Sequence, residues 1–298
     1  MKKYIFTLLS ILFIGSTLFL GKGIYDNMDT FKRYKETYAN ELNFENTLLD
    51  FKDYLFESEY TNEKKESRKS LFKGIKAKEK ATYLGFYIFI IVLLYTGLTY
   101  FFFRKKIIGI KQIGFAILNI SVILLLIGIS VPMLELGAFK KDLTIDLKVY
   151  SKTFDGKMYF FYQCKSILEL IQILFTNHNF VVGFAILLFS IIAPVAKLIM
   201  FYIYLFTSNL NKKTTLLKII SYVGKYSMAD VFVVANFLAY LSFMNMNVGV
   251  NTESSTLVGL YFFFGYCILS IGTYFVIKKK ITEVKEDVKT VKSLDDEF

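Results

Sequence analysis

The segment between residues 190 and 237 most constrains the fold, because two apolar runs there contain residues that a lipid bilayer disfavours. Pro194 and Lys197 lie inside the first run, and Asp230 and Asn236 lie inside the second. A charge at mid-membrane depth costs about 2.5–3.5 kcal/mol on insertion scales, so it usually faces protein or a water-filled cavity. We therefore expect these side chains to face a polar interior rather than lipid.

Composition places the whole chain in the class of helical polytopic membrane proteins. It has 298 residues, 54% of them hydrophobic, and a mean hydropathy of +0.45. The net charge of +11 comes largely from Lys and Arg that flank apolar runs, which indicates membrane orientation and contact with anionic headgroups rather than nucleic-acid binding. The sequence contains no C-x-x-C, Walker A, G-x-S-x-G, H-E-x-x-H or G-x-G-x-x-G motif, so we expect no enzyme activity, cofactor or metal site.

Six apolar runs are long enough to predict membrane-spanning helices, since about 20 residues cross the hydrocarbon core. The short loops expected on one side of the membrane are basic, whereas the 248–255 turn on the other side has no Lys or Arg. Basic loops favour the cytoplasmic side, so both termini are predicted to be cytoplasmic. The first run also fits a signal peptide, although it lacks an A-x-A-like cleavage site. The predicted spans are residues 4–20, 82–103, 112–134, 180–206, 228–247 and 256–277.

Two longer polar regions are predicted on the outer side. Residues 21–81 show amphipathic spacing that favours a helical hairpin with its tip at Ser58–Ser70, and a loosely ordered charged loop is the alternative. In residues 136–178, the alternation in Thr144–Tyr150 and a turn signal at Asp155-Gly156 predict a small outer β-hairpin. Ser166–Phe175 then predicts a short amphipathic helix at the interface.

Lys197 is the sharpest candidate site residue. It lies about nine residues, or roughly 13 Å, from the predicted cytoplasmic end of its helix, farther than a lysine side chain reaches by snorkelling. It has either a functional role or a permanent structural partner. Asp230 is the expected partner, but Ser227-x-x-Asp230 also fits a capping box, which would place Asp230 at a helix start.

Pro194 extends this candidate site. It removes a backbone hydrogen bond and frees a carbonyl near Ser190, either to widen the bundle beside Lys197 or only to bend the helix for packing. The other polar residues of the runs either extend a network across the bundle or hold helices together. The candidate transport network comprises Lys197, Asp230, Pro194, Ser190, Ser227 and Asn236, with Lys225 and an interfacial Glu135 as secondary candidates.

The motifs of this region resemble the paraquat-inducible protein A family. The resemblance rests on A-P-x-x-K-L (Ala193–Leu198) within Phe189–Leu198, and on Gly224–Phe232 (GKYSMADVF). It also includes Pro132 and the segment Gln163–Leu170, and it extends over about residues 113–277.

This resemblance implies a tetraspanin-like four-helix transmembrane unit in a bacterial inner membrane. It further implies phospholipid cargo, an MCE-type periplasmic partner, and coupling to proton movement through polar residues, which Lys197 and Asp230 match here. The chain departs from the family's two units and zinc ribbons, so a homo-oligomer is an option. The predicted division is a two-helix hairpin with a charged extension (1–105), the family-like domain (106–280) and a charged cytoplasmic tail (281–298).

The function expected from these observations is that of a membrane subunit in envelope phospholipid transport. The alternative is a tetraspanin-like scaffold, or an envelope-stress sensor that uses residues 21–81, with no transport activity. In the first case the charged residues of the bundle switch partners or protonation, and in the second they are purely structural.

Overall fold

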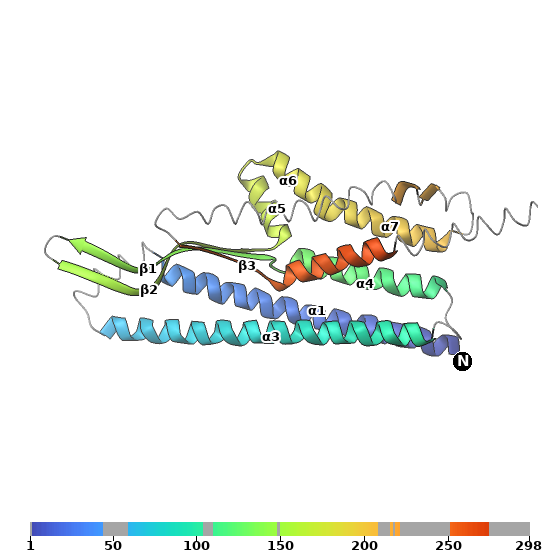
Figure 1. Ribbon diagram of the computed structural model, residues 1–298, viewed down its shortest axis with the longest axis horizontal. Helices are drawn as coiled ribbons and strands as arrows, with labels where there is room; N and C mark the ends of the chain where they lie inside the picture. Colours follow the sequence, from blue (N-terminus) through green and yellow to red (C-terminus); the bar gives the residue numbers. More distant parts are fainter. Residues whose placement is uncertain are drawn as a thin grey trace, which may run out of the picture.

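The protein is mostly helical and carries one small three-stranded sheet. The computed structural model describes residues 2–43, 59–103, 110–147, 150–207, 215–216, 218–220 and 251–273. Figure 1 shows an elongated molecule in which α1 and α3 run along one side, the sheet lies over one end, and the remaining helices lie over the other. The helices are α1 (Lys2–Glu41), α3 (Glu59–Phe103), α4 (Ile110–Ser130), α5 (Ile167–Thr176), α6 (Phe180–Leu187), the π-helix η1 (Leu188–Ile192), α7 (Ala193–Phe206) and the unlabelled helix Val258–Thr273; the strands are β1 (Leu134–Leu147), β2 (Tyr150–Lys165) and β3 (Asn251–Thr256).

The helices α1 and α3 form an antiparallel pair whose two members change character at the same level. A Cβ added at Gly85 would lie 3.1 Å from Ile24, and the Lys78 ammonium donates to the Asn27 side chain at 3.0 Å. Both helices are apolar on the α4 side of this level and charged on the sheet side. The predicted tip Ser58–Ser70 is wrong from Glu59 onward, because its Lys, Glu and Arg residues favour helix even without an apolar face.

The sheet contains more than the predicted hairpin. Its order is β2-β1-β3, and both pairings are antiparallel. The paired residues of the hairpin end at Leu147 and Tyr150, so the chain reverses between them. The predicted turn residues Asp155 and Gly156 instead lie inside β2. They face a single residue of β1, where the register shifts as in a β-bulge. The third strand replaces most of the predicted 248–255 turn. It is a polar edge strand, so its sequence lacks the alternation that would predict a strand.

The number of membrane-spanning helices differs between sequence and structure. Among the described residues, one helical stretch, Phe180–Phe206, is long and apolar enough to cross a membrane by length and composition. The first two predicted spans are parts of the longer helices α1 and α3, and the third ends at Ser130 because the chain enters β1 at Leu134. The span predicted at 228–247 lies outside the described residues, so six spans are not confirmed.

One hydrophobic core joins the N-terminal helices to the rest of the molecule. It includes Ile24 and Phe89 from α1 and α3 together with Leu118 from α4 and Phe262 from the last described helix. At Gly128 a Cβ would lie 2.7 Å from a backbone nitrogen, so glycine allows α4 and Val258–Thr273 to touch. This core therefore extends across the predicted domain boundary after residue 105. The division into domains stays a prediction.

Candidate functional site

The buried face of α7 carries the residues that the sequence singled out. Pro194, Lys197, Leu198 and Phe201 follow each other at spacings of three, one and three, which places them on one side of a helix. Lys197 is only 2% exposed, and it ranks among the largest fully buried side chains of the described residues. The expectation that Lys197 faces the protein interior agrees with this burial.

The bend predicted at Pro194 takes the form of a π-helical turn. The segment Leu188–Ile192 is wound as η1, and the Ala193 backbone N–H donates to the Leu188 carbonyl five residues earlier. Proline has no N–H and its ring clashes with the carbonyl one turn before it, so a wider turn directly ahead of Pro194 relieves both problems. Ser190 lies buried in η1 and lines a small cavity of about 80 Å³ beside Leu170 and Ile186.

Two residues that sequence reasoning missed face this turn from the helix Val258–Thr273. The hydroxyl of the fully buried Tyr266 donates to the Pro194 carbonyl at 3.4 Å. Ser270 lies one helical turn further on, and its buried hydroxyl has no hydrogen-bond partner among the described residues. Both helices run away from the sheet (Figure 1), so Ser270 lies at about the level of Lys197, one turn beyond Pro194.

The second predicted half of this network cannot be placed. Ser227, Asp230, Asn236 and Lys225 all lie outside the described residues. The Lys197–Asp230 pair and the alternative capping role of Asp230 therefore both stay predictions. The structure brings Tyr266 to Pro194, and it buries Ser190, Lys197 and Ser270 on the same helical segments.

A second polar cluster centres on Glu135, which is buried in β1, while its predicted place at the membrane interface stays a prediction. Its carboxylate forms an ion pair with Lys35 of α1 and accepts a hydrogen bond from the Ser255 hydroxyl of β3 at 3.1 Å. The Lys35 ammonium lies 5.9 Å from the ring centre of Tyr162 in β2. Four elements therefore meet at one carboxylate, because the chain forms a strand at Leu134 instead of prolonging the third span.

Burial and the Glu135 charge also shape the chemistry of nearby acids on β2. Burial, with Glu135 as the next cause, raises the pKa of the Tyr162 phenol and raises the pKa of the Cys164 thiol to about 12. Burial likewise raises the pKa of Tyr159 to about 12. These groups stay neutral at physiological pH, so Cys164 has none of the thiolate character that a reactive cysteine needs.

Ion pairs join α1 to the sheet and to α5. Lys32 pairs with Glu169 of α5, Lys35 pairs with Glu135, and Glu36 lies 3.6 Å from the Lys165 ammonium. The three α1 residues are spaced three and one apart, so they share a face of the helix. Sequence reasoning did not identify this face, although the spacing of Lys32, Lys35 and Glu36 was a usable signal.

Glu169 also fixes the start of α5. Its backbone N–H donates to the Ser166 hydroxyl at 3.3 Å, and its carboxylate accepts from the Ser166 backbone N–H at 3.1 Å, which together form a capping box. The short amphipathic helix predicted at Ser166–Phe175 is thus present as Ile167–Thr176, and its place at the membrane interface stays a prediction. Within the described residues, no group of three or more His, Cys, Asp or Glu side chains is arranged to hold a metal ion.

Comparison with known protein families agrees with the motifs of this region. Residues 156–280 match the family model described as Paraquat-inducible protein A, which confirms the resemblance over this range. The match includes α5, α6, η1, α7 and the segment with Asp230, whereas Pro132, α4, α1 and α3 lie outside it. Comparisons with curated proteins and with solved structures give no match.

Proposed function

We propose, from the family match of residues 156–280, that this chain is a multi-pass inner-membrane subunit that moves phospholipid across the envelope together with an MCE-type partner. It acts as a transport component and not as an enzyme. In this proposal both termini are cytoplasmic and the sheet lies on the outer side.

The burial of Lys197 beside the π-helical turn is the observation that carries the proposal. Lys197 is 2% exposed and lies on Phe180–Phe206, the one stretch among the described residues that is long and apolar enough to cross a membrane. A cation there needs polar surroundings, and keeping it there costs free energy that a purely structural bundle avoids by using an apolar residue. π-turns often occur at functional positions. Lys197 is therefore proposed to change its partner or protonation while lipid passes, with Asp230 as the acidic group of the network.

Exposed apolar side chains support membrane insertion of more than one helix. Soluble proteins rarely expose large contiguous apolar patches. Here such side chains are exposed on α1, α3, α4, α6, α7 and Val258–Thr273. Representative members are Phe19, Ile91, Phe115, Phe184, Ile203 and Phe264.

Native mass spectrometry of the protein, extracted gently from its own membrane, tests the proposal because it reports bound lipids and bound subunits together. The wild type is expected to retain phospholipid and an MCE-type subunit. Lys197→Met is expected to lose most of the lipid, while Lys140→Met, at an exposed lysine of β1, serves as the matched control.

A lipid-free wild type bound to an unrelated subunit, and unchanged by Lys197→Met, would overturn transport. That result would favour the scaffold, because the ion pairs of α1 with β1, β2 and α5 then suffice to explain the charged residues as structural contacts. Loss of function on trimming residues 25–78, with Lys197→Met silent, would favour the scaffold or the sensor alternative.

A further inference from the structure

A cleft lies between α1, the end of α4 and the start of α5, outside the polar site on α7. Its volume is about 460 Å³, within the range of about 300–1,000 Å³ typical of small-molecule sites. Gly21 borders it, and a Cβ there would lie 2.6 Å from Ile127, so this glycine sets the close approach of α1 to α4. The α1 and α4 walls of the cleft lie outside the family-matched range, and the α5 wall lies inside it.

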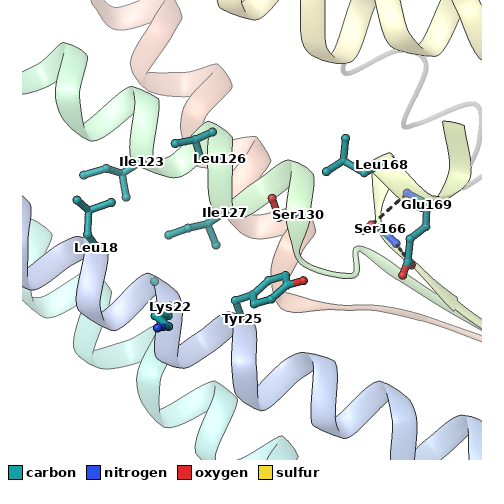
Figure 2. A pocket seen from close by; sticks show the side chains of 11 residues that line it. Leu18, Lys22, Tyr25, Ile123, Leu126, Ile127, Ser130, Ser166, Leu168 and Glu169 are labelled. Atoms are coloured by element: carbon teal, nitrogen blue, oxygen red, sulfur yellow. Dashed lines mark hydrogen bonds between the residues drawn. The ribbon is translucent and has the colours of Figure 1, made fainter. Parts of the chain in front are cut away.

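The two ends of the cleft differ in polarity. Figure 2 shows Leu18, Ile123 and Ile127 together at one end, while Tyr25, Ser130 and Ser166 lie toward the other. This change occurs where α1 passes from apolar to charged residues, which is the expected level of the outer membrane surface. An occupant therefore needs a hydrocarbon part beside a polar part.

Two charged residues, Lys22 and Glu169, line the cleft. The Glu169 carboxylate is already engaged by Lys32 and by the Ser166 backbone N–H. Lys22 also lines the cleft, is exposed, and forms no ion pair within the described residues. A bound molecule therefore meets an ammonium group with no ion-pair partner among the described residues, and Tyr25 lines the same cleft; both complement an anionic headgroup.

The entrance is lined by apolar side chains. Leu18 is 51% exposed and Leu126 is 56% exposed, although both line the cleft. An entrance of this kind is stable when hydrocarbon covers it, and a bilayer supplies that hydrocarbon at this level. The occupant therefore enters from the membrane rather than from water.

We propose that this cleft binds an anionic phospholipid of the outer leaflet, with one acyl chain along Leu18 and Ile127 and its phosphate near Lys22 and Tyr25. The proposal rests on the membrane placement proposed above. It assigns α1 a role in holding lipid beside the family-matched part of the chain.

The test uses the full chain in nanodiscs that contain equal amounts of phosphatidylglycerol and phosphatidylcholine, followed by native mass spectrometry. Leu18→Trp fills the cleft and is expected to lower retained phosphatidylglycerol about tenfold, equivalent to about 1.4 kcal/mol. Leu12→Trp is the matched control, since Leu12 is an exposed leucine of α1 that does not line the cleft. It is expected to retain lipid as the wild type does.

A charge variant tests the headgroup assignment independently, and carries the test if Leu18→Trp fails to fold. Lys22→Glu is expected to lower the retained ratio of phosphatidylglycerol to phosphatidylcholine about fivefold, because each lysine near an anionic surface contributes about 1 kcal/mol. Lys80→Glu, at an exposed lysine of α3 away from the cleft, is expected to leave the ratio unchanged.

The outcomes separate this site from the transport proposal. Equal lipid retention by Leu18→Trp and Leu12→Trp, with no change of ratio in Lys22→Glu, overturns the cleft and leaves the transport function standing. Loss of lipid only in the cleft variants supports the site. A wild type that retains no lipid overturns both proposals.

Discussion

At the scale of single residues, Glu135 shows how one carboxylate holds several elements together. It receives the Lys35 ammonium from α1 and the Ser255 hydroxyl from β3, and its neighbour across the sheet in β2 is Cys164. Both charged partners are largely buried, so removing one charge leaves the other without compensation. A buried pair of this kind costs more to break than an exposed one.

Glu135→Gln is expected to destabilise the protein by about 1–3 kcal/mol, because Lys35 loses a charged acceptor in a partly buried site. The thermal midpoint in detergent, followed by circular dichroism, measures the change. Glu253→Gln is the matched control: Glu253 pairs with Lys157 in an exposed position, and its loss is expected to cost no more than about 1 kcal/mol. Equal midpoints for the two variants would contradict the central role of Glu135.

At the scale of elements, the π-helical turn decides which residues of α7 face the core. A π-turn adds one residue to the preceding turn, and so changes the face on which every later residue lies. With η1 present, Pro194, Lys197, Leu198 and Phe201 are buried, while Val195 and Ile199 are exposed.

Deleting Ile192 together with Pro194→Ala is expected to convert η1 into regular α-helix and to keep the buried face of α7 unchanged. The deletion removes the residue that the π-turn adds, and the alanine supplies the backbone N–H that proline lacks. Deleting Ile199 instead rotates all later residues by about 100°. That control is expected to move Phe201 out of the core, which lowers the free energy of unfolding by about 3–5 kcal/mol.

Thermal midpoints and size-exclusion profiles compare the two deletions, both of which remove one exposed isoleucine. A deletion of Ile192 as damaging as that of Ile199 would show that η1 is not a simple one-residue insertion.

At the scale of the whole molecule, the sheet lies at one end of an elongated structure, and α4 and α7 reach the other (Figure 1). The α1–α3 pair connects these ends, with its charged half beside the sheet and its apolar half beside α4. This polarity suits a protein that stands in a bilayer with the sheet outside it, as proposed above.

In a cysteine-free background, Lys140→Cys in β1 is expected to react with a membrane-impermeant maleimide in intact spheroplasts. Thr207→Cys, at the far end of α7, is expected to react only after permeabilisation. Gel-shift labelling measures both. Reaction of Thr207→Cys alone from outside would reverse the proposed orientation, and reaction of both would contradict it.

Local patterns in the sequence were enough to predict the helical character of the chain, the β1–β2 hairpin, the helix α5 and the burial of Lys197. Each of these depends on local periodicity, on a local capping motif, or on the cost of a charge in an apolar run. The family resemblance also followed from short motifs, and it is confirmed for residues 156–280.

Four features emerged from the three-dimensional packing alone: the third strand, the position of the hairpin turn, the approach of Tyr266 to Pro194 and the surroundings of Glu135. β3 pairs with β1 more than 100 residues away in sequence, and no local pattern specifies that partner. The contact between α1 and α4 likewise depends on where long helices cross, and it forms the cleft beside Gly21. Such contacts join residues distant in the chain, which is why neither periodicity nor motif spacing revealed them.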